Sequence, residues 1–163
     1  CRIGAALGAD VPFCVCSGSQ RGRGIGDQLE QLPSLPAWEV IIIHPQVPVY
    51  TGKAYGLFDQ LEQIKPVAVD RVVRAVQQQN FAMLTASMGN TFEELVIPDV
   101  PLIETCRTLL QAQGLRPLMA GSGPTVFALV PPQENGQQLY DKIRDAASTQ
   151  PMDVYISRLV RSE

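Results

Sequence analysis

The chain has 163 residues, of which 45% are hydrophobic and 18% are charged, so it can form a folded domain with a core. Its net charge of −3 and its pI near 5.2 argue against a nucleic-acid-binding protein, which needs a basic face. No apolar run approaches the ~20 residues of a membrane span. The cysteines Cys1, Cys14, Cys16 and Cys106 form no disulfide or zinc pattern. We therefore expect reduced thiols and a cytoplasmic protein.

The first informative stretch, Gly8-Ala9-Asp10-Val11-Pro12-Phe13, places a carboxylate before a stiff Val-Pro step. Because the residue before proline favours extended backbone, we predict a strand over residues 11–16. Asp10 has two interpretations. It is either a turn carboxylate that accepts hydrogen bonds from nearby backbone N–H groups, or a rigidly held acceptor for the proton of an attacking hydroxyl.

The next stretch, Arg21-Gly22-Arg23-Gly24-Ile25-Gly26, is loosened by three glycines and indicates a strand or a loop. Arg21 and Arg23 are either solvated surface charges or ligands of an anionic substrate. Pro33 and Pro36 then mark a linker. We place a domain boundary there, with residues 1–36 on one side and residues 37–163 on the other.

The chain after this linker has a regular pattern. It predicts a strand at 40–43, a helix at 51–58, a helix opened by Pro66, helices at 81–94 and 101–113, strands at 115–119 and 125–130, a helix at 137–147 and a strand at 154–160. Without the additional helices, this order is strand, helix, strand, strand, helix, strand. The sequence therefore predicts an α+β fold of the ferredoxin-like, split βαβ type, with extra helices in the first crossover.

Two further groups of residues are candidates for a site. Gly121, Ser122 and Gly123 join the predicted strands at 115–119 and 125–130. They form either a plain hairpin loop or a backbone segment that passes close to a phosphate. Thr51 either caps the helix that it begins or contributes its hydroxyl to an active site.

These motifs resemble those of the GHMP kinases, the family of galactokinase and of homoserine, mevalonate and phosphomevalonate kinases. The stretch around Asp10 is similar to the family's aspartate motif, and Ala120-Gly121-Ser122-Gly123-Pro124-Thr125-Val126-Phe127 is similar to its third, glycine-rich motif. The arginine–glycine stretch at 21–26, the threonine turn at 47–55 and the asparagine segment Met88-Gly89-Asn90 with Phe92-Glu93 resemble further motifs. The five occur in the family's order.

The resemblance implies a C-terminal GHMP kinase domain preceded by a remnant of an N-terminal, ribosomal-protein-S5-like domain. It also implies that ATP and Mg²⁺ are used and that the substrate is a small molecule. The motif set most resembles members acting on 4-diphosphocytidyl-2-C-methyl-D-erythritol in the non-mevalonate isoprenoid route. By this resemblance Asp10 is the catalytic aspartate and Thr51 an active-site threonine. The residues Gly121, Ser122 and Gly123 are neighbours of the phosphate loop.

The family's Gly-Gly-Gly-Ser-Ser phosphate loop and its N-terminal lysine are not in this sequence. The chain opens on Cys1, within an apparent motif, so we expect a fragment of a longer enzyme. Because phosphoryl transfer depends on positioning and charge stabilisation, we expect the chain alone to be inactive. Its N-terminal remnant would expose apolar surface and favour self-association.

Two alternatives stay open. The first keeps the family but changes the substrate, to homoserine or to phosphomevalonate. The second is a stand-alone ferredoxin-like binding or regulatory module. Such a module has no need of a glycine-rich segment of more than thirty residues before its first core strand, and this favours the kinase interpretation.

Overall fold

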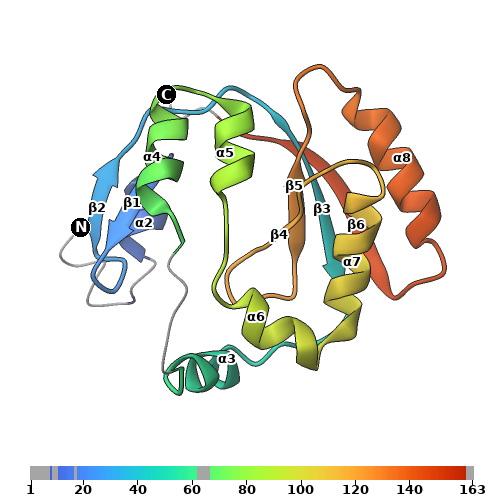
Figure 1. Cartoon of the computed structure of the whole chain (residues 1–163), viewed down its shortest axis with the longest axis horizontal. Helices are drawn as coiled ribbons and strands as arrows, with labels where there is room; N and C mark the ends of the chain where they lie inside the picture. Colours follow the sequence, from blue (N-terminus) through green and yellow to red (C-terminus); the bar gives the residue numbers. More distant parts are fainter. Residues whose placement is uncertain (1–7, 9–10, 17, 62–66, 161–163) are drawn as a thin grey trace.

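The computed structural model describes residues 8, 11–16, 18–61 and 67–160. The elements are, in chain order, α2 (Val11–Cys16), β1 (Gln20–Arg23), β2 (Gln28–Gln31), β3 (Glu39–Pro45), α3 (Thr51–Phe58), α4 (Val69–Gln77), α5 (Phe81–Ser87), α6 (Glu93–Val96), the 3-10 helix η1 (Ile97–Asp99), α7 (Pro101–Gln111), β4 (Leu118–Met119), β5 (Val126–Leu129), α8 (Gly136–Ala147) and β6 (Met152–Arg158) (Figure 1). Among them, no helix is long and apolar enough to cross a membrane.

The centre of the fold is a four-stranded antiparallel sheet with the order β4-β5-β3-β6. β3 is an inner strand, and its Ile41 pairs with Ala128 of β5 on one side and Ile156 of β6 on the other. Helices α3 to α7 lie between β3 and β4, and α8 lies between β5 and β6. This order of strands and crossovers confirms the predicted α+β, ferredoxin-like split βαβ fold.

Both faces of the sheet are covered, which explains the continuous apolar run in β3. Ile41 and Ile43 are fully buried and pack with residues of α7 and α8, whereas Val40 packs with residues of α4 and α5. Figure 1 shows these two helix pairs on opposite sides of the sheet. Because side chains alternate along a strand, a strand covered on both sides is apolar at successive positions.

The α7 helix contributes three fully buried residues to the core on one face of the sheet. Its residues Ile103, Cys106 and Leu110 are 0% exposed and recur at the spacing of one helical face. Burial raises the pKa of the Cys106 thiol to about 11, so this thiol stays protonated at neutral pH and packs as a small apolar group. Each buried Ile or Leu stabilises the fold by about 1.5–3 kcal/mol.

The predicted strand at residues 11–16 is wrong, because Val11–Cys16 is the helix α2. The chain turns into it through a hydrogen bond from the Val11 N–H to the Gly8 carbonyl (3.2 Å). Pro12 lies in the first turn, where the backbone N–H has no partner within the helix. The same proline that disfavours helix at the preceding residue is therefore well suited to the start of a helix. Cys14 and Cys16 are exposed on this helix.

The glycine-rich stretch that follows forms a hairpin. β1 and β2 pair antiparallel and are joined by a turn in which Gly24 and Gly26 have positive φ. Arg23 forms an ion pair with Glu30 across the hairpin (3.5 Å), and Arg21 forms one with Asp70 of α4 (2.8 Å). Both arginines are therefore paired within the chain. The boundary at residues 36 and 37 stays a prediction.

The predicted helix at 81–94 is also wrong in its extent. α5 ends at Ser87, Met88 is extended (φ −60°, ψ 142°), and α6 begins only at Glu93. Asn90 interrupts the helix because its side-chain oxygen accepts a hydrogen bond from the N–H of Phe92 (2.9 Å), a local turn that competes with helix. The helix predicted after Pro66 is present as α4, which begins at Val69, whereas its predicted start at Pro66 lies outside the described residues.

Candidate active site

The turn between β4 and β5 contains the predicted site residues Gly121, Ser122 and Gly123. It is closed by hydrogen bonds from the Ala120 N–H to the Thr125 carbonyl (2.8 Å) and from the Gly123 N–H to the Ala120 carbonyl (2.9 Å). Gly121 (φ 54°) and Gly123 (φ 86°) both have backbone angles that favour glycine. The geometry of the turn thus favours glycine at both ends of the Gly-Ser-Gly sequence.

The underside of this turn rests on Met119. A Cβ atom added at Gly123 would lie 2.8 Å from the sulfur of Met119, which is 1% exposed. A Cβ added at Gly121 would meet nothing within 4 Å. One glycine therefore allows close packing below the turn, whereas the other leaves the outer side of the turn open.

Two of the predicted site elements meet at this turn. The hydroxyls of Thr51 and Ser122 share a hydrogen bond (3.1 Å) across a separation of 71 residues. Thr51 is the first residue of α3 and does not cap it, since Tyr50 stands at the N-cap position without a side-chain hydrogen bond. The capping interpretation of Thr51 is therefore wrong, and its hydroxyl lies against the Gly121–Gly123 turn.

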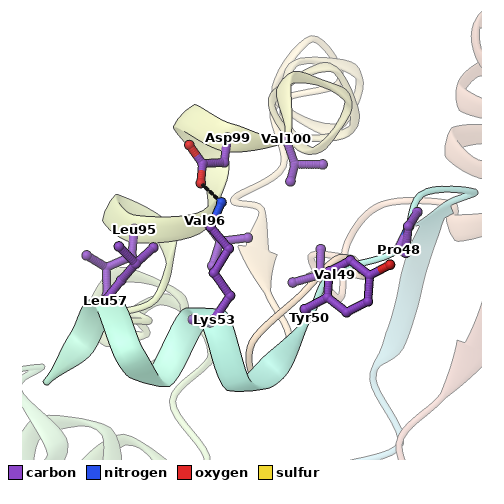
Figure 2. Close-up of a pocket in the computed structure, with 10 residues that line it drawn as sticks. Pro48, Val49, Tyr50, Lys53, Leu57, Leu95, Val96, Asp99 and Val100 are labelled. Carbon is purple, nitrogen blue, oxygen red and sulfur yellow. Dashed lines mark hydrogen bonds and ion pairs between the residues drawn. The ribbon is translucent and has the colours of Figure 1, made fainter.

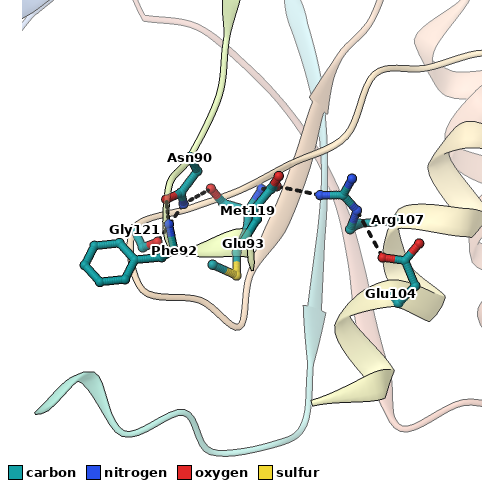
Figure 3. A network of polar contacts seen from close by, with 7 residues as sticks. All are labelled: Asn90, Phe92, Glu93, Glu104, Arg107, Met119 and Gly121. Atoms are coloured by element: carbon teal, nitrogen blue, oxygen red, sulfur yellow. Dashed lines mark hydrogen bonds and ion pairs between the residues drawn. The ribbon is translucent and has the colours of Figure 1, made fainter. Parts of the chain in front are cut away.

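The segment around Asn90, which resembles a family motif, has contacts with this turn that its sequence does not predict. The Asn90 amide donates to the carbonyls of Met119 (2.8 Å) and Gly121 (2.7 Å), and Glu93 accepts a hydrogen bond from the Met119 N–H (2.7 Å) (Figure 3). These partners lie 26 to 31 residues away along the chain. In the sequence, this segment is marked only by an Asn and a Glu three residues apart after a glycine. That pattern does not indicate which backbone groups the two side chains contact.

A charged network continues from Glu93 into α7. The Arg107 guanidinium lies 2.7 Å from the Glu93 carboxylate and 3.3 Å from that of Glu104. The Arg107 and Glu93 side chains are only 20% and 18% exposed. Removing one partner of such a pair costs more than removing an exposed pair does. This pair therefore anchors the start of α6 to the core helix α7.

A small pocket of about 190 Å³ lies beside α3. It is lined by Pro48, Val49, Tyr50, Lys53, Ala54, Leu57, Leu95, Val96, Asp99 and Val100 (Figure 2). Lys53 and Asp99 form an ion pair (2.7 Å) between α3 and η1 at this pocket. This contact ties the helix that begins with Thr51 to the segment after α6.

Asp10, the predicted catalytic aspartate, lies outside the described residues, and α2 begins directly after it. Thr51 and the Gly121–Gly123 turn, by contrast, are brought together by the hydrogen bond between Thr51 and Ser122. Within the described ranges no group of three or more His, Cys, Asp or Glu side chains could hold a metal ion.

The family comparison identifies the domain that carries this turn. Residues 69–149 match the profile described as "GHMP kinases C terminal". The chain belongs to the GHMP kinase family. The matched region of this GHMP kinase chain contains the asparagine segment, α7 and the complete β4–β5 turn.

Curated relatives of this GHMP kinase chain share a single name. It is 36% identical over 160 residues to the "4-diphosphocytidyl-2-C-methyl-D-erythritol kinase" of Exiguobacterium sibiricum, a match that covers 98% of this chain and 54% of the relative. It is 33% identical to the protein of the same name from Geobacillus kaustophilus, over 88% of this chain and 49% of the relative. The chain spans about half the length of the curated relatives it matches.

Solved structures support the fold. A crystal structure of 4-(cytidine 5'-diphospho)-2C-methyl-D-erythritol kinase matches with a TM-score of 0.73 at 23% identity, covering 97% of this chain and 56% of that one. A homoserine kinase from Cytophaga hutchinsonii matches with a TM-score of 0.72 at 24% identity, covering 91% of this chain and 51% of that one. Because the two scores are nearly equal, the fold does not separate the two substrates.

Proposed function

We propose that the complete protein containing this chain, here called the parent protein, is an ATP-dependent kinase of non-mevalonate isoprenoid precursor biosynthesis. It transfers the γ-phosphoryl group of ATP to the 2-hydroxyl of 4-diphosphocytidyl-2-C-methyl-D-erythritol. The observation that carries the proposal is the hydrogen bond between Thr51 and Ser122, since it unites two motifs of the family at one turn. The names of the relatives, at 36% and 33% identity, support this substrate over the others.

In this proposal each predicted site residue has one task. Asp10 accepts or orients the proton of the attacking hydroxyl. Thr51 contributes a hydroxyl beside the reacting groups. The Gly121–Gly123 turn packs next to the phosphate loop, and the open space over Gly121 fits the close approach that this requires.

We propose that Mg²⁺ is held mainly by the ATP phosphates, as is usual for this ion in kinases. When bound, it neutralises charge on the phosphates. We also propose that the protein acts in the cytoplasm on small molecules, with neither nucleic acid nor membrane as a partner.

The proposed substrate is tested by measuring ADP release from the parent protein with three alcohols. We expect kcat/KM for 4-diphosphocytidyl-2-C-methyl-D-erythritol to exceed the values for homoserine and phosphomevalonate by about 10³-fold or more, because a site that pairs with the polar groups of one substrate rejects others that lack them. A preference for either other alcohol would keep the family but refute the proposed substrate. No turnover with all three would refute the proposed activity.

The isolated 163-residue chain is expected to show no ATP turnover under the same conditions, because the glycine-serine phosphate loop is not in its sequence. Exposed apolar side chains, Phe13 and Val15 of α2 and Ile25 of the hairpin turn, also favour self-association of this chain. Sedimentation equilibrium tests the second expectation. Measurable kinase activity of the isolated chain would contradict the expected lack of turnover. A monomer at all concentrations would contradict the expected self-association.

A further inference from the structure

The strand that leads into the Gly121–Gly123 turn lies at the edge of the sheet and is only two residues long. On its inner side β4 pairs with β5, and the next inward bond runs from Ala120 to Thr125. Because backbone groups alternate in direction along a strand, Met119 points its N–H and C=O away from β5. At a sheet edge such groups need partners from outside the sheet.

Both of these backbone groups receive a side chain as partner. Glu93 accepts from the Met119 N–H (2.7 Å), and the Asn90 amide donates to the Met119 carbonyl (2.8 Å). The same amide nitrogen also donates to the Gly121 carbonyl (2.7 Å), inside the turn itself. The segment 90–93 therefore takes the place of a neighbouring strand and extends its hold into the turn (Figure 3).

The orientation of the Asn90 amide is fixed by its own partners. Its oxygen faces the N–H of Phe92 (2.9 Å), so its nitrogen faces the two carbonyls. Glu93 is fixed in turn by Arg107 of α7. Both side chains that hold the turn are thus held themselves, and the chain of contacts runs from the core helix to Gly121.

We infer that Asn90 is a positioning residue, whose amide nitrogen sets the shape of the Gly121–Gly123 turn and, through Ser122, the place of the Thr51 hydroxyl. Its effect on phosphoryl transfer rests on the proposed function. Its effect on the shape of the turn does not. An amide is needed at this position because the role requires an acceptor on one side and donors on the other, and a carboxylate supplies acceptors only.

The test is Asn90→Asp in the parent protein. Aspartate keeps the size of the side chain and the acceptor for Phe92, but it turns an oxygen toward two carbonyls. We expect kcat to fall roughly tenfold or more, since small displacements of positioned groups are costly, while KM for the alcohol stays within about twofold. A matched control is Asn135→Asp, because Asn135 caps α8 through its oxygen alone and aspartate caps equally well.

A second measurement does not depend on the reaction. In the proton–nitrogen correlation spectrum of the 163-residue chain, the amides of Gly121, Ser122 and Gly123 should shift in Asn90→Asp and stay unchanged in Asn135→Asp. Unchanged turn amides in Asn90→Asp would overturn the inference, even if the parent protein phosphorylates none of the alcohols. Shifted amides with unchanged kcat would overturn its catalytic part.

If Asn90→Asp fails to fold, Asn90→Ser carries the same test. Its single hydroxyl is too short to reach both carbonyls, so the turn amides should shift and kcat should fall. Both effects should be smaller than those expected for Asn90→Asp, because serine turns no carboxylate oxygen toward the carbonyls. Wild-type kcat and wild-type turn amides in the folded Asn90→Ser protein would overturn the inference.

Discussion

Replacing Gly123 by alanine is expected to destabilise the 163-residue chain by about 2–4 kcal/mol. Two causes add. The backbone at this position has φ 86°, where an L side chain is strained, and the new Cβ would lie 2.8 Å from the Met119 sulfur. Met119 is 1% exposed, so its thioether has little room to move aside. Urea unfolding of both proteins measures the difference.

A matched control separates the two causes. Gly114, after the end of α7, also has positive φ (74°), but a Cβ there meets nothing within 4 Å. Gly114→Ala should therefore cost only the backbone strain, about 1–2 kcal/mol. Equal losses for the two variants would mean that Met119 yields to the added atom, and the close packing under the turn would then have no energetic importance.

Replacing Asp10 by asparagine in the parent protein is expected to lower kcat by about 10²–10⁴-fold, the usual contribution of general acid–base catalysis. Asparagine keeps the shape of the side chain but cannot accept a proton. The KM for ATP should change little, because the proposed role of Asp10 concerns the attacking hydroxyl. Steady-state kinetics with ATP varied at a saturating concentration of the alcohol substrate measures both parameters.

The control for this variant is Asp27→Asn, which removes a carboxylate from the exposed turn between β1 and β2. It should leave kcat unchanged. A loss of kcat in Asp10→Asn no greater than that in the control would remove Asp10 from the catalytic machinery, and it would favour the interpretation as a turn carboxylate.

The fold could be predicted well where one period dominates the sequence. The spacing of Ile103, Cys106 and Leu110 predicts one face of α7, and the apolar run of β3 predicts a buried strand. Two of the errors in secondary structure arise where a single residue favours two different local conformations. Pro12 disfavours helix before itself yet suits the first turn of one, and Asn90 stops a helix that its apolar neighbours continue.

The site could be predicted in part. The resemblance to the family selected Thr51 and Ser122, and the structure brings their hydroxyls within 3.1 Å. The supporting contacts of Asn90 and Glu93 could not be predicted, because their partners are backbone groups 26 to 31 residues away. Because almost every residue has the same backbone N–H and C=O groups, the sequence does not indicate which of them a side chain contacts. These contacts become visible only once the sheet edge and residues 90–93 are placed.

The substrate is a separate question from the fold. The match to a homoserine kinase, with a TM-score of 0.72, is as good as that to the diphosphocytidyl enzyme, at 0.73. Specificity must therefore come from particular side chains, and folds of this kind are shared by enzymes of different substrates.

We propose that Asp10 and the Gly121–Gly123 turn belong to one phosphotransfer site. A crystal structure of the parent protein with a non-hydrolysable ATP analogue and 4-diphosphocytidyl-2-C-methyl-D-erythritol tests it most directly. We expect the Asp10 carboxylate within hydrogen-bond reach of the 2-hydroxyl, about 2.6–3.2 Å, and the turn beside the loop that holds the phosphates. Phosphates bound far from the turn, with Asp10 on another side of the molecule, would contradict it.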